Sequence, residues 1–234
     1  MNNSTAPAQM GNTDFGFDNF DPETIQSPDT INVVFVIDTS SSVANYSDVM
    51  ETAFNNMKNN LKTSHVKDQL FFSKIIFNSD IVSQTGFQPI VSVDDVQLNC
   101  MGSTALYRST KVGLQNAISY RKALENNGIN CKTLVFVITD GEDMEGGRGM
   151  TAAAEVKAMI GELLAEERNF ASFTSIMFGV GDRPALFEEA QRQMGIQQLA
   201  LISAAPEDVR KMINFISSSI SSTAAGVPVS TANF

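Results

Sequence analysis

The chain has 234 residues, which is the size of one large domain with tails rather than of two domains. Its formal net charge of −10 argues against nucleic acid or an anionic membrane as the main partner. The cysteines, Cys100 and Cys131, are too few for a disulfide framework or a Cys-based zinc site, and the lone histidine, His65, excludes histidine-based catalytic triads and multi-histidine metal sites. No apolar run reaches the roughly 18 residues that span a bilayer. No Lys or Arg precedes Lys58, so we expect no signal peptide and a cytoplasmic protein.

The chain divides by composition into three parts. Residues 1–30 contain acidic but no basic side chains and are rich in Asn, Gly, Pro and Asp, so we expect a disordered tail. Residues 31–222 carry the apolar patterns of a folded domain, and residues 223–234 are predicted to form a flexible tail. Aromatic and acidic side chains alternate in the first tail, which could dock on a partner, fold back over a groove, mediate self-association or simply aid solubility; they are Asp14, Phe15, Phe17, Asp18, Phe20 and Asp21.

Apolar runs of strand length alternate with segments of helical period along the domain. This pattern predicts an α/β fold: a Rossmann-like, doubly wound, mainly parallel central sheet with helices on both faces. A weaker run at residues 87–93 contains Pro89 and is expected to form an edge strand, antiparallel to its neighbour. The stronger strands are predicted at residues 31–37, 70–77, 133–138, 172–180 and 198–202.

Helices are predicted from stripes of apolar residues three and four positions apart. One further helix is expected between residues 105 and 124, with its end near Gly128. We assign the Met and aromatic side chains of these stripes to the core and not to a cofactor. The other stripes lie at residues 50–61, 156–164, 186–194 and 209–220.

Two of the predicted strands end in a carboxylate followed by small or polar residues. The first ends in IDTSSS at Asp38, and the second ends in ITDGED at Asp140. Ligands of open parallel sheets bind beyond the carboxyl ends of the strands, so the two carboxylates are expected to share one site.

The stretch after Asp38 allows several interpretations. It lacks the glycines and the Lys of a nucleotide P-loop. A flavin-phosphate cradle would suffer repulsion from both aspartates, a phosphoaspartyl transferase of the haloacid-dehalogenase type needs an Asp where Ser40 stands, and a nucleophilic serine lacks a base. Simple helix capping by Ser40, Ser41 and Ser42 would explain this loop alone, but not Asp140.

A third segment supplies more oxygen atoms. In NCMGSTALYRS, residues 99–109, Gly102 loosens the backbone, and Ser103 and Thr104 precede a helix, where they could also act only as caps. Residues two apart in an extended loop face the same way, so Ser40 and Ser42 can converge while the intervening residues turn aside. Hard oxygen donors without sulfur or nitrogen suit Mg²⁺, Mn²⁺ or Ca²⁺.

Together these motifs resemble the metal-ion-dependent adhesion site of von Willebrand factor A (VWA) domains: Asp-x-Ser-x-Ser after the first strand, Gly-x-Thr before a helix, and Thr-Asp-Gly after a later strand. The resemblance spans residues 31 to about 222, and Ser41 replaces the usual Gly of the first motif. It implies that the metal site is formed by Asp38, Ser40, Ser42, Thr104 and Asp140. The stretch from residue 175 to residue 222 is most similar to small bacterial VWA proteins of the tellurium-resistance and stress-response group.

The resemblance implies a protein-interaction module and not an enzyme. Neutral hydroxyl ligands would leave a divalent cation most of its charge, so we expect a Glu or Asp of a protein partner to complete its coordination. A metal-assisted hydrolase or phosphatase is the alternative, although such a site needs further Asp, Glu or His ligands. Glu142, Asp143 and Glu145 border the expected site and are interpreted as solvated rim rather than as cation recruiters. The oligomeric state is left open.

Overall fold

The computed structural model describes residues 18–166 and 172–231, with the side chain of Glu166 left out. Phe15, Phe17 and Asp14 of the aromatic and acidic cluster lie outside the described residues. The regular elements, with η marking 3₁₀ turns, are η1 (Pro22–Thr24), β1 (Asp29–Asp38), η2 (Ser41–Asn45), α1 (Ser47–Lys62), η3 (Lys67–Gln69), β2 (Leu70–Phe77), β3 (Ile81–Gln84), β4 (Gln88–Pro89), η4 (Ile90–Ser92), α2 (Leu106–Asn126), β5 (Asn130–Thr139), α3 (Gly147–Glu166), β6 (Phe173–Val180), α4 (Pro184–Met194), β7 (Gln198–Ile202) and α5 (Pro206–Ala224).

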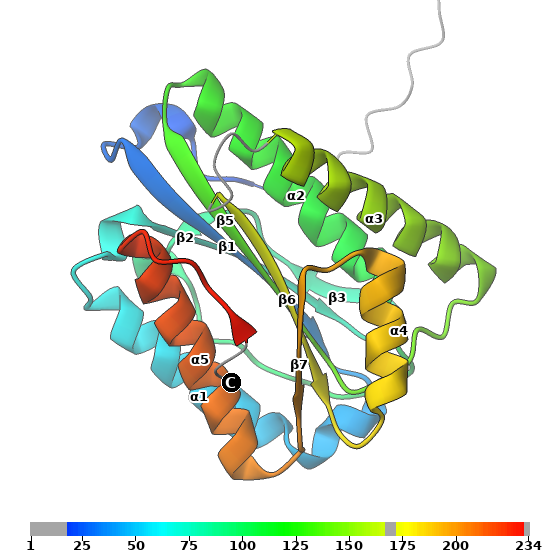
Figure 1. Cartoon of the computed structure of the whole chain (residues 1–234). Coiled ribbons are helices and arrows are strands. Elements are labelled where there is room, and N and C mark those ends of the chain that lie inside the picture. The colour runs from blue at the N-terminus through cyan, green and yellow to red at the C-terminus, as the bar shows by residue number, and fades with distance from the viewer. Residues whose placement is uncertain (1–17, 167–171, 232–234) are drawn as a thin grey trace, which may run out of the picture.

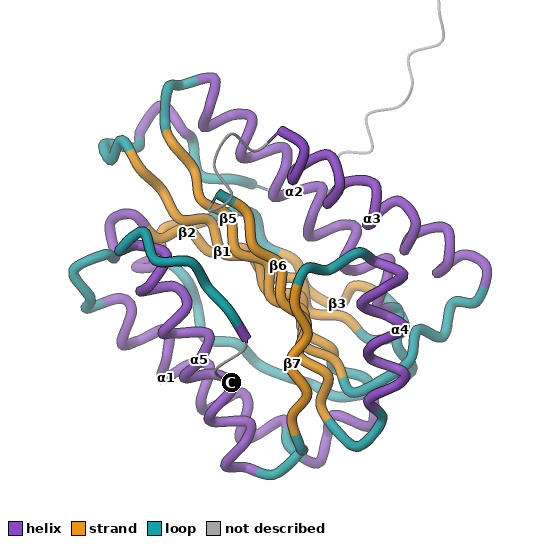
Figure 2. The backbone as a smooth tube through the Cα atoms, in the orientation of Figure 1, coloured by secondary structure: helices purple, strands orange, loops and turns teal. Residues whose placement is uncertain are grey.

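The strands form a twisted sheet in the order β3-β2-β1-β5-β6-β7, with β4 pairing beside β3 on the outer side of β2. Strands β2, β1, β5, β6 and β7 are parallel, whereas β3 and β4 run antiparallel to β2. Figures 1 and 2 show α1 and α5 on one face of this sheet and α2, α3 and α4 on the other. The predicted doubly wound α/β fold is therefore confirmed.

Side-chain alternation in β1 explains why the sheet is covered on both faces. Val33, Phe35 and Ile37 enter the core beneath α1 and α5, and Val34 and Val36 enter the core beneath α2 and α3. Successive side chains of a strand point to opposite faces, so a continuous apolar run is buried on both. Among the helices that the structure describes, none has the length and apolar character of a membrane span.

The antiparallel edge was predicted only in part. The run at residues 87–93 pairs with β2 only at Gln88 and Pro89, and then turns into η4. Proline has no N–H to donate to a continuing ladder, which agrees with this short pairing. The four-residue strand β3 was missed, because its sequence IVSQ gives too short an apolar pattern.

The N-terminal segment from residue 18 differs from the expected disorder, because it packs against the domain. The amide N–H of Phe20 donates to the carbonyl of Phe87 at 2.8 Å. The Asn19 side chain accepts from the N–H of Phe87 at 2.7 Å and donates to Asn116 of α2 at 3.0 Å. Phe20 also packs on Phe71, with ring centroids 5.9 Å apart. We call residues 18–25 the N-terminal strap.

The end of the domain also extends beyond its predicted boundary. Helix α5 continues to Ala224, and the chain then returns beside β7. There the Gln198 side chain donates to the carbonyl of Val229 at 3.0 Å and accepts from the N–H of Thr231 at 2.7 Å. Part of the predicted flexible tail at residues 223–234 therefore contacts the sheet.

Candidate metal site at the strand ends

The site lies where β1 and β5 end side by side. Ile37 pairs with Ile138 in parallel register, so Asp38 and Thr139 reach the same edge of the sheet. The hydroxyl of Thr139 donates to Oδ2 of Asp38 at 2.7 Å. Beyond this edge the chain runs from β1 to α1 on one face and from β5 to α3 on the other, which is where open α/β sheets bind ligands.

The first loop brings three predicted residues into one hydrogen-bonded cluster. The N–H of Ser40 donates to Oδ1 of Asp38 at 2.7 Å. The Oγ atoms of Ser40 and Ser42 are 3.3 Å apart, and the Ser42 hydroxyl donates to Oδ1 of Asp140 at 2.7 Å. The two strand ends are thus linked through Ser42.

The intervening residues turn aside, as expected. The Thr39 hydroxyl donates to the carbonyl of Phe77 at 2.9 Å, and the Ser41 hydroxyl donates to the carbonyl of Gly102 at 3.1 Å. The extended loop that was expected to make Ser40 and Ser42 face the same way is found only in part, because Ser42 lies in the 3₁₀ turn η2. Ser40 precedes this turn but its side chain makes no capping hydrogen bond, which argues against capping as its role.

The second loop places Thr104 beside Asp140. Gly102 has φ +72°, a conformation that favours glycine, and its carbonyl also accepts from the N–H of Ser41 at 3.1 Å. A Cβ on Gly141 would stand 3.0 Å from Oγ1 of Thr104, so the glycine after Asp140 leaves space for this hydroxyl. Thr104 is buried, and α2 begins without a side-chain cap from the residue before it.

Burial dominates the electrostatics of the two carboxyl groups. Desolvation raises the pKa of Asp38 to about 6, although hydrogen bonds from Thr139 and Ser40 oppose this shift. Desolvation also raises the pKa of Asp140, whereas the Ser42 hydrogen bond and Arg183 lower it. Within the described residues neither carboxylate forms an ion pair. The guanidinium of Arg183 instead donates to the backbone carbonyl of Asp140 at 2.5 Å.

Tyr46 adds a polar atom that the sequence did not reveal. Its side chain is 3% exposed, and its hydroxyl lies near the carboxylate of Asp140, whose pKa it helps to lower. Burial, together with the negative charges of Asp140 and Asp38, raises the pKa of this phenol. The hydroxyl of Tyr46 is therefore a polar neighbour of Asp140 at the strand ends.

The glycine-rich loop at residues 141–149 is a structural element and not merely a solvated rim. Asp143 accepts from the N–H groups of Tyr107 and Glu145, both at 3.1 Å, and thereby caps the start of α2. Glu145 accepts from Nε of Arg108 at 3.0 Å, and Nη1 of the same guanidinium donates to Asp80 at 2.7 Å. Asp143 and Glu145 therefore hold this loop, whereas Glu142 is exposed, as expected of a solvated rim.

The five predicted residues are brought together, and their chemistry is compatible with a hard divalent cation. They offer two carboxylates and three hydroxyls, and hydroxyl and carboxylate oxygens are ligands of Mg²⁺, Mn²⁺ and Ca²⁺. Tyr46, Thr139 and Arg183 were missed as neighbours of the site. Only Thr139 gave a signal, as part of the Thr-Asp-Gly motif.

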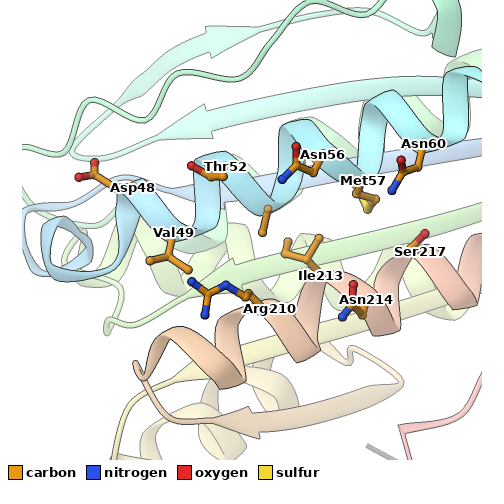
Figure 3. Close-up of a pocket in the computed structure, with 11 residues that line it drawn as sticks. Asp48, Val49, Thr52, Asn56, Met57, Asn60, Arg210, Ile213, Asn214 and Ser217 are labelled. Carbon is orange, nitrogen blue, oxygen red and sulfur yellow. The ribbon is translucent and has the colours of Figure 1, made fainter.

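Other hollows of the surface are separate from this site. A groove with a volume of about 390 Å³ lies between α1 and α5. Figure 3 shows Asn56, Asn60, Asn214 and Arg210 along its walls. None of the five strand-end residues lines it. The groove therefore has no part in the site derived above.

The protein is a doubly wound α/β domain, and carboxylates and hydroxyls gather at the ends of its two central strands. The family model "von Willebrand factor type A domain" matches residues 32–224, so the chain belongs to the VWA family. Domains of this family are generally protein-interaction modules and typically not enzymes.

Solved structures share the fold at low sequence identity. A pilus adhesin, SpaC from Lactobacillus rhamnosus GG, is 13% identical, with a TM-score of 0.57 over 82% of this chain and 30% of that chain. A mutant of the PilB minor pilin from Streptococcus sanguinis is 13% identical, with a TM-score of 0.56 over 88% of this chain and 65% of that chain. A von Willebrand factor type A structure from Catenulispora acidiphila is 15% identical, with a TM-score of 0.51 over 82% of this chain and 42% of that chain.

These likenesses concern the fold alone. The chain spans less than two thirds of the length of each of these three proteins. No curated protein matches the chain significantly in sequence.

Proposed function

We propose that this VWA domain binds a protein partner through a divalent cation, Mg²⁺ or else Mn²⁺ or Ca²⁺, at the ends of β1 and β5. Ser40, Ser42 and Thr104 would hold the cation by their hydroxyls, and Asp38 and Asp140 would act directly or through water. The observation that carries the proposal is the hydrogen-bonded cluster of Asp38, Ser40, Ser42 and Asp140, in which Ser42 bonds Asp140 at 2.7 Å.

The proposal is also supported by the electrostatics of the two carboxyl groups. Burial opposes the ionisation of both carboxyls, and no cationic side chain pairs with either one in the described residues. A cation would stabilise their charged forms. When bound among mainly neutral oxygens, it would offer a Lewis-acidic position to a Glu or Asp of the partner.

The proposed setting is cytoplasmic, in a stress-response or other multi-protein complex. It is supported by the resemblance of residues 175–222 to the tellurium-resistance group. A hydrolytic function has less support, because the described residues contain no group of three or more His, Cys, Asp or Glu side chains that could hold a metal. Two-metal hydrolases need such groups.

Metal titration of the purified chain tests the site itself. Mg²⁺, Mn²⁺ and Ca²⁺ are titrated by calorimetry into the wild type, Thr104→Val and Ser41→Ala. Thr104→Val keeps the side-chain shape but removes the hydroxyl, so we expect the affinity to fall at least about tenfold. Ser41→Ala is the matched control, since its hydroxyl bonds the carbonyl of Gly102, and its affinity should stay within about twofold.

Affinity capture with and without EDTA tests the partner. We expect a protein that the wild type retains only with metal and that Asp38→Ala does not retain. Equal metal affinity in the wild type and Thr104→Val, or partner capture that neither EDTA nor Asp38→Ala changes, would contradict the proposal.

A further inference from the structure

Two exposed methionines stand on the loops that form the strand-end site. Met101 is 60% exposed and lies three residues before Thr104, and Met144 is 66% exposed and lies four residues after Asp140. A single exposed apolar side chain is common on a protein surface. Two on the loops that meet at one polar cluster call for a different explanation.

A backbone hydrogen bond joins Met144 to Thr104 of the site, and another joins Met101 to Thr39, which lies between Asp38 and Ser40. The N–H of Met101 donates to the carbonyl of Thr39 at 2.9 Å, and the N–H of Met144 donates to the carbonyl of Thr104 at 2.8 Å. The two side chains therefore emerge from anchored backbone beside the five oxygen-bearing residues. Methionine is unbranched and polarizable, so it adapts to varied apolar surfaces of a partner.

Arg183 gives the same edge a positive group. One N–H of its guanidinium donates to the carbonyl of Asp140. The side chain is exposed and forms no ion pair with the described residues. A guanidinium has five N–H donors, so others are free for a carboxylate. Exposed Glu142 and Asp182 oppose an acidic partner, and a bound divalent cation would offset this repulsion.

We infer that the partner presents a Glu or Asp flanked by apolar side chains, which pack against Met101 and Met144 while the carboxylate reaches the strand-end site beside Arg183. This inference rests on the proposed function and adds to it the chemistry of the partner's surface. The acidic group of the partner would make binding depend on the metal. The apolar neighbours would provide much of the affinity, because binding would bury their surface and that of the methionine side chains away from water.

A displayed peptide library tests this chemistry without knowledge of the partner. Each peptide is a disulfide-closed loop with a central Glu and randomised neighbours, and it is selected on the full chain in Mg²⁺ or in EDTA. Selections are run on the wild type, on the double variant Met101→Gln/Met144→Gln, and on the matched control Val82→Gln/Val91→Gln. The control residues are 55% and 52% exposed and lie near the antiparallel edge of the sheet.

We expect Mg²⁺-dependent peptides with Leu, Ile, Met or aromatic neighbours on the wild type and the control. Affinity for these peptides should fall about fivefold to tenfold in the methionine variant, while its Mg²⁺ affinity by calorimetry is unchanged. Mg²⁺-dependent peptides with polar neighbours, or equal affinity for both double variants, would overturn this inference and leave the proposed function standing. An absence of any Mg²⁺-dependent peptide would overturn both.

Discussion

Asp38 makes the stability of the metal-free protein depend on pH in an unusual direction. Its pKa is about 6 in the folded chain, against 3.8 for an unperturbed Asp, because the carboxyl is buried. Between these values the folded state holds a proton that the unfolded state has released. The contribution of Asp38 is therefore fully present below about pH 4 and is lost as the pH rises through about 6.

The variant Asp38→Asn isolates this contribution. In EDTA, the free energy of unfolding of the wild type should fall relative to that of Asp38→Asn by up to about 1.4 kcal/mol per pH unit between pH 4 and pH 6. Urea unfolding at a series of pH values measures the difference. A difference that stays constant, or that grows in the opposite direction, would show that the carboxyl does not carry this proton.

Single residues of the site were predictable where a motif marked them. Asp38, Ser40, Ser42, Thr104 and Asp140 follow strands or precede a helix in the sequence, and the structure brings them together. Tyr46 could not be predicted, because its hydroxyl approaches the carboxylates only through packing at the start of α1. The role of the five motif residues as metal ligands stays a prediction.

The loop at residues 141–149 couples the end of β5 to the start of α2. Asp143→Ala should remove the cap of Tyr107 and a bond inside the loop, and so lower the free energy of unfolding by about 1–2 kcal/mol. Glu142→Ala is the matched control: its side chain is exposed, and its effect should stay within about 0.5 kcal/mol. Urea unfolding at neutral pH measures both variants, and equal stabilities would rule out the capping role of Asp143.

Helices and parallel strands were predicted well, because their apolar patterns are long. The predicted strand at residues 70–77 matches β2 and the one at residues 198–202 matches β7. The N-terminal strap agrees with only one of the interpretations left open for its aromatic and acidic residues, and the sequence could not select it, since its order depends on contacts of Asn19 and Phe20 with residues far along the chain. Local composition carries no information about such contacts.

The position of β1 and β5 at the centre of the sheet predicts where the whole molecule is most resistant to opening. Each is paired on both sides, and nearly all their side chains are buried. In hydrogen exchange followed by mass spectrometry, peptides from β1 and β5 should exchange slowest and those from β3 and β4 at least about tenfold faster. Exchange in β3 as slow as in β1 would contradict this order of local stability.

The pairing of β1 with β5 makes the strand-end cluster depend on the folding of the whole domain. Ser42 and Asp140 are 98 positions apart in sequence, so their contact is non-local and requires the closure of a long loop. An unfolded or half-assembled chain has no such cluster. A cation bound there would select completed molecules and stabilise them by about 2.7 kcal/mol at a concentration one hundred times its Kd. Newly made chains would thus become competent for a partner only when their folding is finished.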